Sequence, residues 1–222
     1  MTFDVHFKTI PPRFLHLEKT ILSWLYQTVP VRNIIITVCK EYKNFPDSDV
    51  YILNRYKVLS PKIIIQVVEN DYGPSDKVVG SLKIENHTFT IICDDDIYYH
   101  EDTVLSYKEM IGKDHEIYTH FYDSNRAGHL QGADTYLLTP YFFEKVTLDE
   151  YTSFLEKCFI ECSDTFFQDD YLISYFLKKK GFIVKPVTNR LAYTLVHLIN
   201  ELHRHPDVHR REQNTIHYLK NL

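Results

Sequence analysis

Residues 91–97 have the sequence Ile91-Ile92-Cys93-Asp94-Asp95-Asp96-Ile97, in which a short apolar run meets three consecutive aspartates. A short apolar run that ends at polar residues is typical of a buried strand. Three adjacent carboxylates repel one another, and a divalent cation relieves this repulsion. Because Mg²⁺ and Mn²⁺ bind carboxylate oxygens together with substrate phosphates, the stretch predicts a strand that ends at a cation site.

The aspartate triplet also fits a simpler interpretation, an acidic loop in front of a helix, where carboxylates favour the helix N-terminus. The aromatic residues Tyr98 and Tyr99 that follow indicate a packed surface beside the triplet and favour the cation site. In an extended segment, Asp94 and Asp96 point to one side and Asp95 to the other. We therefore expect Asp94 and Asp96 to share one ligand site, and Asp95 to pack or to cap.

Strand-like and helix-like segments alternate along the rest of the chain. Apolar and β-branched runs predict strands at residues 5–10, 34–38, 63–68, 89–93, 116–122, 135–139 and 182–184. Apolar residues at helical spacing predict helices at residues 13–28, 101–111, 149–158, 170–180, 191–202 and 208–219, with another starting at Ser75 or Asp76. This alternation is typical of an α/β domain with a mostly parallel central sheet flanked by helices. We expect the domain over residues 1–190 and a helical C-terminal extension packed on it over residues 191–222.

Composition narrows the class of protein further. The formal net charge of -5 over 222 residues disfavours a nucleic-acid partner, which needs a basic surface. The four cysteines form no Cys-x-x-Cys pair, which disfavours a zinc site. We find no signal-peptide pattern and no apolar stretch of the ~18 residues that a membrane span requires. The sequence therefore predicts a soluble cytoplasmic protein with reduced thiols.

Ligands of open α/β sheets bind outside the carboxyl ends of the strands. Besides the aspartate triplet, three unusual segments follow predicted strands. They are residues 9–13 (Thr-Ile-Pro-Pro-Arg), the region of Lys40, and residues 71–77 (Asp-Tyr-Gly-Pro-Ser-Asp-Lys). We expect these segments to meet the triplet at one edge of the sheet.

Four motifs, in order along the chain, resemble those of GT-A-fold, Asp-x-Asp-type glycosyltransferases, which use nucleotide sugars. Residues 9–13 and the helix behind them, which contains Ser23-Trp24-Leu25-Tyr26-Gln27-Thr28, resemble the opening of this fold. Residues 71–77 resemble its Asp-x-Gly-Pro-x-x-Lys donor-binding turn, and residues 91–97 its Asp-x-Asp motif. Residues 168–172 (Gln-Asp-Asp-Tyr-Leu) resemble the acidic motif that opens a late helix and carries the catalytic base. The resemblance covers residues 1–190 and is nearest to the small glycosyltransferase domains encoded by large algal DNA viruses, so a viral protein would act in the host cytoplasm.

The resemblance implies a metal-dependent enzyme that moves a sugar from a nucleotide sugar, with UDP as the expected nucleotide, to a hydroxyl of a glycan acceptor. Asp96 would ligate Mn²⁺ or Mg²⁺, with Asp94 on the metal or the ribose and His197 as a candidate third ligand. Asp170 would be the catalytic base, and Asp169, which stands where the family has glutamate, is the alternative. The residues implied in donor binding are Thr9, Pro12, Arg13, Asp71, Lys77, Asp94, Asp95, Gly132, Ala133 and Asp134. A base opposite the leaving group implies direct displacement and inversion at the anomeric carbon.

Each implied role has a structural alternative. Arg13 also fits a surface ion pair, Asp71 a turn cap, and Lys77 an exposed helix lysine. Both Asp169 and Asp170 suit a helix N-cap. His197 lies in an apolar stretch and fits a core histidine, and residues 132–134 fit a simple turn.

Two other functions compete with glycosyl transfer. A nucleotidyltransferase that makes nucleotide sugars needs a glycine-rich N-terminal loop to hold a triphosphate, and no glycine occurs between Met1 and Glu69. A sugar-nucleotide or glycan-binding module without turnover is the second alternative. The presence of both acidic motifs disfavours a module without turnover.

Overall fold

The computed structural model describes residues 1–85, 87–112, 116–120, 130, 135–187, 191, 194–195 and 206–222 of the chain. Within these residues, seven strands form one mixed sheet in the order β3-β2-β1-β4-β7-β6-β8. The strands are β1 (Phe3–Lys8), β2 (Asn33–Cys39), β3 (Ile63–Val68), β4 (Phe89–Ile92), β6 (Glu116–Thr119), β7 (Tyr136–Leu138) and β8 (Ile183–Pro186).

The first four strands of the sheet run parallel, with Val5 of β1 opposite Ile34 of β2 and Ile91 of β4. Ile34, Ile35 and Ile36 of β2 are fully buried, as expected for a sheet that is covered on both faces. β7 is antiparallel to both β4 and β6, and β8 is parallel to β6. The predicted α/β fold with a mostly parallel sheet is therefore confirmed, with β7 as its reversed strand.

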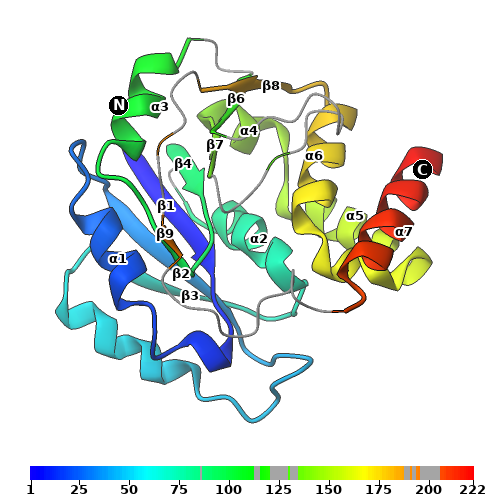
Figure 1. Ribbon diagram of the computed structural model, residues 1–222, viewed down its shortest axis with the longest axis horizontal. Coiled ribbons are helices and arrows are strands. Elements are labelled where there is room, and N and C mark those ends of the chain that lie inside the picture. The colour runs from blue at the N-terminus through cyan, green and yellow to red at the C-terminus, as the bar shows by residue number, and fades with distance from the viewer. Residues whose placement is uncertain are drawn as a thin grey trace.

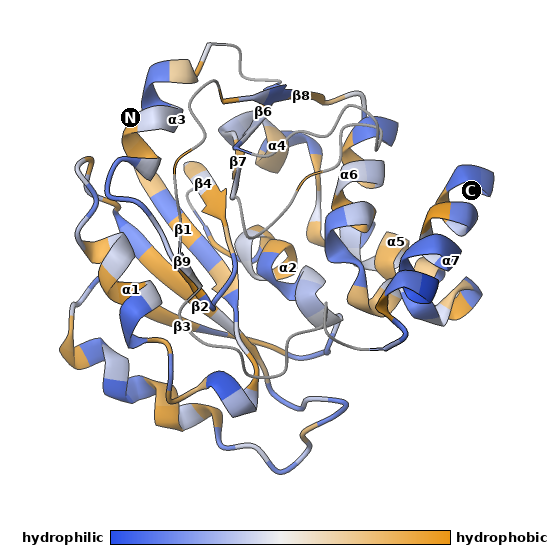
Figure 2. Ribbon diagram, in the orientation of Figure 1, coloured by the Kyte–Doolittle hydropathy of each residue, from blue (hydrophilic) through white to orange (hydrophobic). Residues whose placement is uncertain are grey.

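Helices cover the sheet on both sides. The α-helices are α1 (Glu18–Leu25), α2 (Asp76–Leu82), α3 (Thr103–Met110), α4 (Pro140–Lys145), α5 (Leu148–Glu161), α6 (Asp169–Lys179) and α7 (Val208–Asn221). The 3-10 helices are η1 (Pro11–Arg13), η2 (Val50–Val58), η3 (Gly73–Ser75) and η5 (Ser163–Phe167). Figure 1 shows α1 and α2 on opposite sides of the β1–β3 part of the sheet, with α5, α6 and α7 beyond α2. The strands between these layers are largely hydrophobic, as Figure 2 shows.

Glycine allows α2 to pack closely on the sheet. A Cβ atom at Gly80 would lie 2.1 Å from the hydroxyl of Thr37 on β2, so a larger residue would push the helix away. Gly181 follows α6 with φ +79, a left-handed conformation that glycine adopts readily after a helix. Among the described residues, no helix has both the length and the apolar character needed to cross a bilayer.

Several elements differ from the sequence prediction. The helix expected at residues 13–28 begins only at Glu18, because the hydroxyl of Tyr56 holds the preceding segment in an irregular shape, donating to Phe14 O and accepting from Leu17 N. The helix predicted at residues 191–202 is wrong at Thr194 and Leu195. Thr194–Leu195 form β9, which pairs antiparallel with β5 (Ile97–Tyr98), and local periodicity does not reveal such a long-range pairing. The short helices η2 and α4 were not predicted from the sequence.

A buried histidine in β1 makes the stability of the fold depend on pH. His6 is 1% exposed, and burial lowers its pKa to about 3, with smaller contributions from His87 and Arg32. In the unfolded chain its pKa is 6.5, so below that pH the unfolded chain binds a proton that the folded chain excludes. The contribution of His6 to stability is therefore complete above pH 6.5 and is lost progressively as the pH falls toward 3.

We expect His6 to lower the free energy of unfolding by about 2 kcal/mol between about pH 7.5 and about pH 5. Urea unfolding of the wild-type chain and of His6→Leu at both pH values measures this contribution, because leucine has no proton to bind. The stability of the wild type relative to His6→Leu should therefore fall by about 2 kcal/mol at the lower pH. An equal pH dependence in both chains would show that His6 is not held neutral.

Candidate active site

The carboxyl ends of β1 to β4 bring the four unusual segments together. Lys8 ends β1 and Thr9 follows it, and Cys39 ends β2. Asp71 follows β3 and Asp94 follows β4. Backbone hydrogen bonds extend the ladders to this edge, from Thr9 N to Thr37 O and from Lys40 N to Val68 O. The predicted convergence of these segments is confirmed, and the candidate site is built on the ends of buried strands.

Arg13 pairs with two carboxylates of the aspartate triplet. Its Nη1 lies 2.5 Å from Asp95 Oδ1 and 3.2 Å from Asp96 Oδ2. The prediction that Asp94 and Asp96 face one side and Asp95 the other is wrong, since Asp95 and Asp96 share one guanidinium. The reason is local: β4 ends at Ile92, and Asp95 and Asp96 form a turn instead of continuing the strand.

The triplet retains strong negative potential in spite of Arg13. Burial, together with the neighbouring Asp94 and Asp95, raises the pKa of Asp96 to about 7, although Arg13 opposes this shift. Among the described residues, Asp95 Oδ2 is buried without a hydrogen-bond partner. Thr20 Oγ1 donates to Asp95 O at 2.9 Å and holds the turn in place. The cluster is thus rigid and rich in carboxylate oxygen.

Lys77 joins the triplet to the N-terminus of α6. Its Nζ lies 2.8 Å from Asp94 Oδ1 and 2.8 Å from Asp169 Oδ2, and its side chain is 4% exposed. Burial by itself would lower the pKa of Lys77, but Asp169, Asp94 and Asp170 together raise it well above its usual value. Lys77 is therefore a buried cation between two acidic motifs, and the alternative of an exposed helix lysine is wrong.

The two acidic residues of α6 differ in environment. Asp169 is buried and paired with Lys77, whereas Asp170 is half-buried, and its carbonyl accepts a hydrogen bond from Ser174 Oγ at 2.6 Å. Neither residue is the N-cap of α6, which is Gln168. Asp169 is committed as the counter-ion of Lys77. Asp170 is the more exposed of the two residues.

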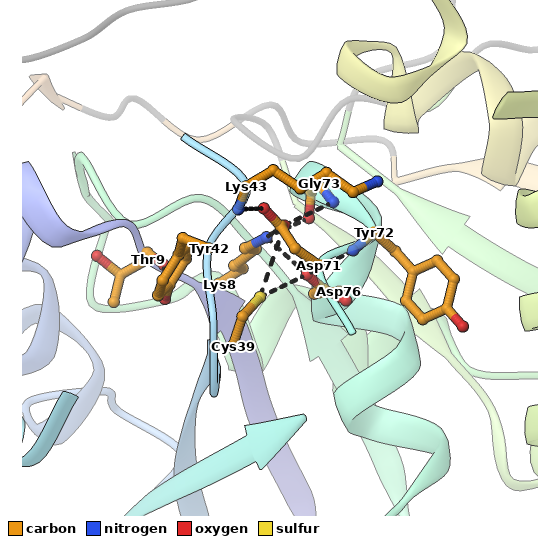
Figure 3. A network of polar contacts seen from close by, with 9 residues as sticks. All are labelled: Lys8, Thr9, Cys39, Tyr42, Lys43, Asp71, Tyr72, Gly73 and Asp76. Atoms are coloured by element: carbon orange, nitrogen blue, oxygen red, sulfur yellow. Dashed lines mark hydrogen bonds and ion pairs between the residues drawn. The ribbon is translucent and has the colours of Figure 1, made fainter. Parts of the chain in front are cut away.

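A second buried cation, Lys8, lies where β1 ends (Figure 3). Its Nζ donates to Asp71 Oδ1 at 2.7 Å, to Gly73 O at 2.7 Å and to Asp76 Oδ2 at 2.6 Å. The thiol of Cys39 donates to the same Asp76 oxygen at 3.1 Å. This Lys8 network ties β1 and β2 to the loop that leads into α2. Lys77 belongs to the first turn of α2, so the network fixes its position.

Asp71 takes part in the Lys8 network with both carboxylate oxygens. Oδ1 also accepts from Gly73 N at 3.0 Å, and Oδ2 accepts from Lys43 N at 3.0 Å. Lys8 holds the pKa of Asp71 below its usual value, although burial acts in the opposite direction. The turn-cap alternative thus describes the contacts of Asp71, and its role toward a donor stays a prediction.

Cys39, Asp71 and Asp76 have the ligand spacing of a metal site, with their three ligand atoms within 4.8 Å of one another. The ammonium group of Lys8 contacts both carboxylates of this set, so their cation is the lysine. Sequence analysis missed Lys8, Cys39 and Asp76. The sequence signal for this network is a lysine at the end of a buried strand, Lys8, together with two aspartates in one loop, Asp71 and Asp76.

The remaining predicted site residues divide into two groups. Thr9 is buried, with Tyr42 OH donating to its carbonyl at 2.8 Å, and Pro12 lies in η1 next to Arg13. Gly132, Ala133, Asp134 and His197 lie outside the described residues.

The fold is similar to that of solved glycosyltransferases. Glucosyl-3-phosphoglycerate synthase from Mycobacterium tuberculosis, solved with Mn²⁺, UDP and glucosyl-3-phosphoglycerate, has 13% identity and a TM-score of 0.62 over 100% of this chain and 80% of that one. A mannosyltransferase from Pyrobaculum calidifontis, solved with GDP-Man and Mn²⁺, has 12% identity and a TM-score of 0.51 over 83% of this chain. This chain spans only about half of that mannosyltransferase, 53% of its length.

HddC from Yersinia pseudotuberculosis has 12% identity and a TM-score of 0.55 over 98% of each chain. No protein-family model matches the sequence, and no curated protein matches it. At these low identities the similarity concerns the architecture, a GT-A, Rossmann-like sheet, while function has to be argued from the site.

Proposed function

We propose that this chain is a metal-dependent glycosyltransferase that moves a sugar from a nucleotide sugar, with UDP as the expected nucleotide, to a hydroxyl of a glycan acceptor. The observation that carries the proposal is the Lys77 bridge between the aspartate triplet and the acidic N-terminus of α6. It joins a carboxylate cluster suited to a cation to an acidic pair suited to proton transfer. Two similar structures were solved with Mn²⁺ and a nucleotide or nucleotide sugar, which supports this chemistry.

The aspartate triplet has a donor set that fits a divalent cation. It offers several carboxylate oxygens, and Asp95 Oδ2 is a buried acceptor that has no hydrogen-bond partner within the described part of the chain. Asp96 and Asp94 would hold Mn²⁺ or Mg²⁺. When bound, the cation stabilises the negative charge that develops on the departing diphosphate.

Two cationic side chains beside the triplet suit the diphosphate of the donor. The planar guanidinium of Arg13 can donate two parallel hydrogen bonds to a phosphate. Lys77 offers a point charge that is fixed by its two aspartates. Both side chains are largely withdrawn from water, which strengthens their attraction for an anion.

Asp170 would accept the proton of the acceptor hydroxyl as that oxygen attacks the anomeric carbon. Asp169 would hold Lys77 and so keep the base close to the donor site. Attack opposite the leaving diphosphate proceeds by direct displacement and inverts the anomeric configuration.

The state of the cysteines supports an intracellular location. Cys39, Cys93, Cys158 and Cys162 are all free thiols, and three of them are buried. Unpaired cysteines are typical of a reducing compartment, so we propose that the enzyme acts in the cytoplasm.

The test of the proposed reaction is to incubate the chain with UDP-sugars and GDP-sugars, with and without Mn²⁺, and with simple glycan acceptors. We expect Mn²⁺-dependent release of free nucleoside diphosphate, slow with water alone and faster with an acceptor. Release of pyrophosphate from a sugar phosphate and a nucleoside triphosphate would instead identify a nucleotidyltransferase. Nucleotide binding without any release would identify a binding module.

A further inference from the structure

The 3-10 helix η2 presents two outward columns of side chains. A 3-10 helix has three residues per turn, so residues three apart lie above one another. Val50, Leu53 and Tyr56 form the buried column. The other columns, Tyr51-Asn54-Lys57 and Ile52-Arg55-Val58, are exposed at every position. In Figure 1, η2 is the light-blue to cyan coil at the lower left, on the periphery of the molecule.

The outward columns of η2 carry large apolar side chains. Tyr51 is 76% exposed and Val58 is 86% exposed, and Ile52 and Leu59 are exposed beside them. Figure 2 shows this coil as alternating hydrophobic and hydrophilic patches. Single exposed apolar residues are common, but four within residues 51–59 indicate a surface that is covered by a partner.

The charge of this segment is opposite to that of the chain. Residues 50–68 contain Arg55, Lys57 and Lys62 and no aspartate or glutamate, while the whole chain has a net charge of -5. Within the described residues, Arg55 and Lys57 form no ion pair. Each basic side chain thus lies beside an exposed apolar one and keeps its charge available for an anion.

We propose that η2 binds the anionic surface of a lipid bilayer. Tyr51, Ile52, Val58 and Leu59 would enter the headgroup region, and Arg55 and Lys57 would bind lipid phosphates. Exposed apolar side chains accompanied by basic ones on one short helix are typical of interfacial attachment. A protein partner is less suitable, because nine residues cannot supply the roughly 800 Å² per side of a standard interface.

The proposed membrane surface is linked to the donor site. The hydroxyl of Tyr56, on the buried side of η2, contacts Phe14 O and Leu17 N, just after Arg13. Attachment through η2 would hold this edge of the sheet at the bilayer. The inference stands on η2 alone and does not depend on the proposed reaction.

The test is co-sedimentation of the full chain with two kinds of vesicle, phosphatidylcholine alone and phosphatidylcholine mixed with phosphatidylglycerol. We expect binding to the mixed vesicles only, weakened by salt. The variant Ile52→Asp/Val58→Asp should lower the affinity by about tenfold or more, and Arg55→Glu/Lys57→Glu by a similar factor. Ile160→Asp is the matched control, because Ile160 on α5 is 85% exposed and lies outside η2. It should bind as the wild type does.

Three results would overturn the proposal. One is equal sedimentation of the wild type with both kinds of vesicle. Another is an equal loss of binding in Ile160→Asp and Ile52→Asp/Val58→Asp. The third is binding to soluble polyglutamate that depends on Arg55 and Lys57 but not on Ile52 and Val58, which would indicate an acidic protein partner. Because all the substituted side chains are exposed, the variants should unfold at the same temperature as the wild type, which shows that they are folded.

Discussion

Replacement of Asp170 by asparagine is expected to reduce sugar transfer by roughly 10³-fold while leaving donor binding intact. The substitution removes the proton acceptor and keeps the size and polarity of the side chain. Asp169→Asn should act differently, because Asp169 is the counter-ion of Lys77 at 2.8 Å. Its loss should loosen the Lys77–Asp94 pair and weaken donor affinity.

Steady-state kinetics with a nucleotide sugar and Mn²⁺ separates these two effects. Asp170→Asn should lower kcat with little change in the donor KM, and Asp169→Asn should mainly raise the donor KM. Asp149→Asn is the matched control, since Asp149 also lies in the first turn of a helix, α5, but is exposed. If Asp169→Asn loses kcat and Asp170→Asn does not, the base is Asp169.

Replacement of Lys8 by methionine is expected to destabilise the fold by about 3–5 kcal/mol, because it leaves two buried carboxylates without their cation. Asp71 and Asp76 both pair with Lys8 in a site from which water is excluded. Burial raises the pKa of Asp76, and Lys8 is the main group that opposes this shift. Methionine fills the space of the lysine stem but offers no charge.

Urea unfolding at neutral pH measures the loss. Lys40→Met is the matched control, because the Lys40–Glu69 pair is exposed on both sides, and such pairs contribute about 0–1 kcal/mol. The double variant Lys8→Met/Asp76→Asn should recover part of the stability, because it removes one of the two carboxylates that Lys8→Met leaves buried and unpaired. A loss in Lys8→Met as small as that in Lys40→Met would show that the Lys8 network does not hold the strand ends together.

Much of the sheet was predictable from local pattern. The β-branched run at residues 34–38 belongs to β2, which is buried almost throughout, and the run at residues 63–68 belongs to the partly buried edge strand β3. Both runs are apolar enough to predict a strand without knowledge of their partners. The reversal of β7 and the β5–β9 pair depend on contacts between distant residues. Helix η2 was not predicted, because its buried residues recur every three positions and so do not follow the period of an α-helix.

The location of the site could be predicted from the sequence, but most of its ion pairs could not. The triplet, Arg13 and Lys77 meet because parallel strands bring their carboxyl ends to one edge. Which cation pairs with which aspartate depends on the turn at Asp95 and on the reach of the Lys77 side chain. Lys8 belongs to no recognisable sequence motif. Its structural role follows from its ion pairs with Asp71 and Asp76, which the fold buries around it.

The most direct test of the proposed cation and donor site is titration calorimetry of UDP into the wild-type chain and into Asp96→Ala, with Mn²⁺ and with a chelator. For the wild type we expect UDP to bind in the presence of Mn²⁺ and to bind far more weakly with the chelator. For Asp96→Ala we expect the weak, metal-independent binding under both conditions. Equal UDP affinity of the two chains in Mn²⁺ would contradict the assignment of the aspartate triplet as a cation site for a nucleotide donor.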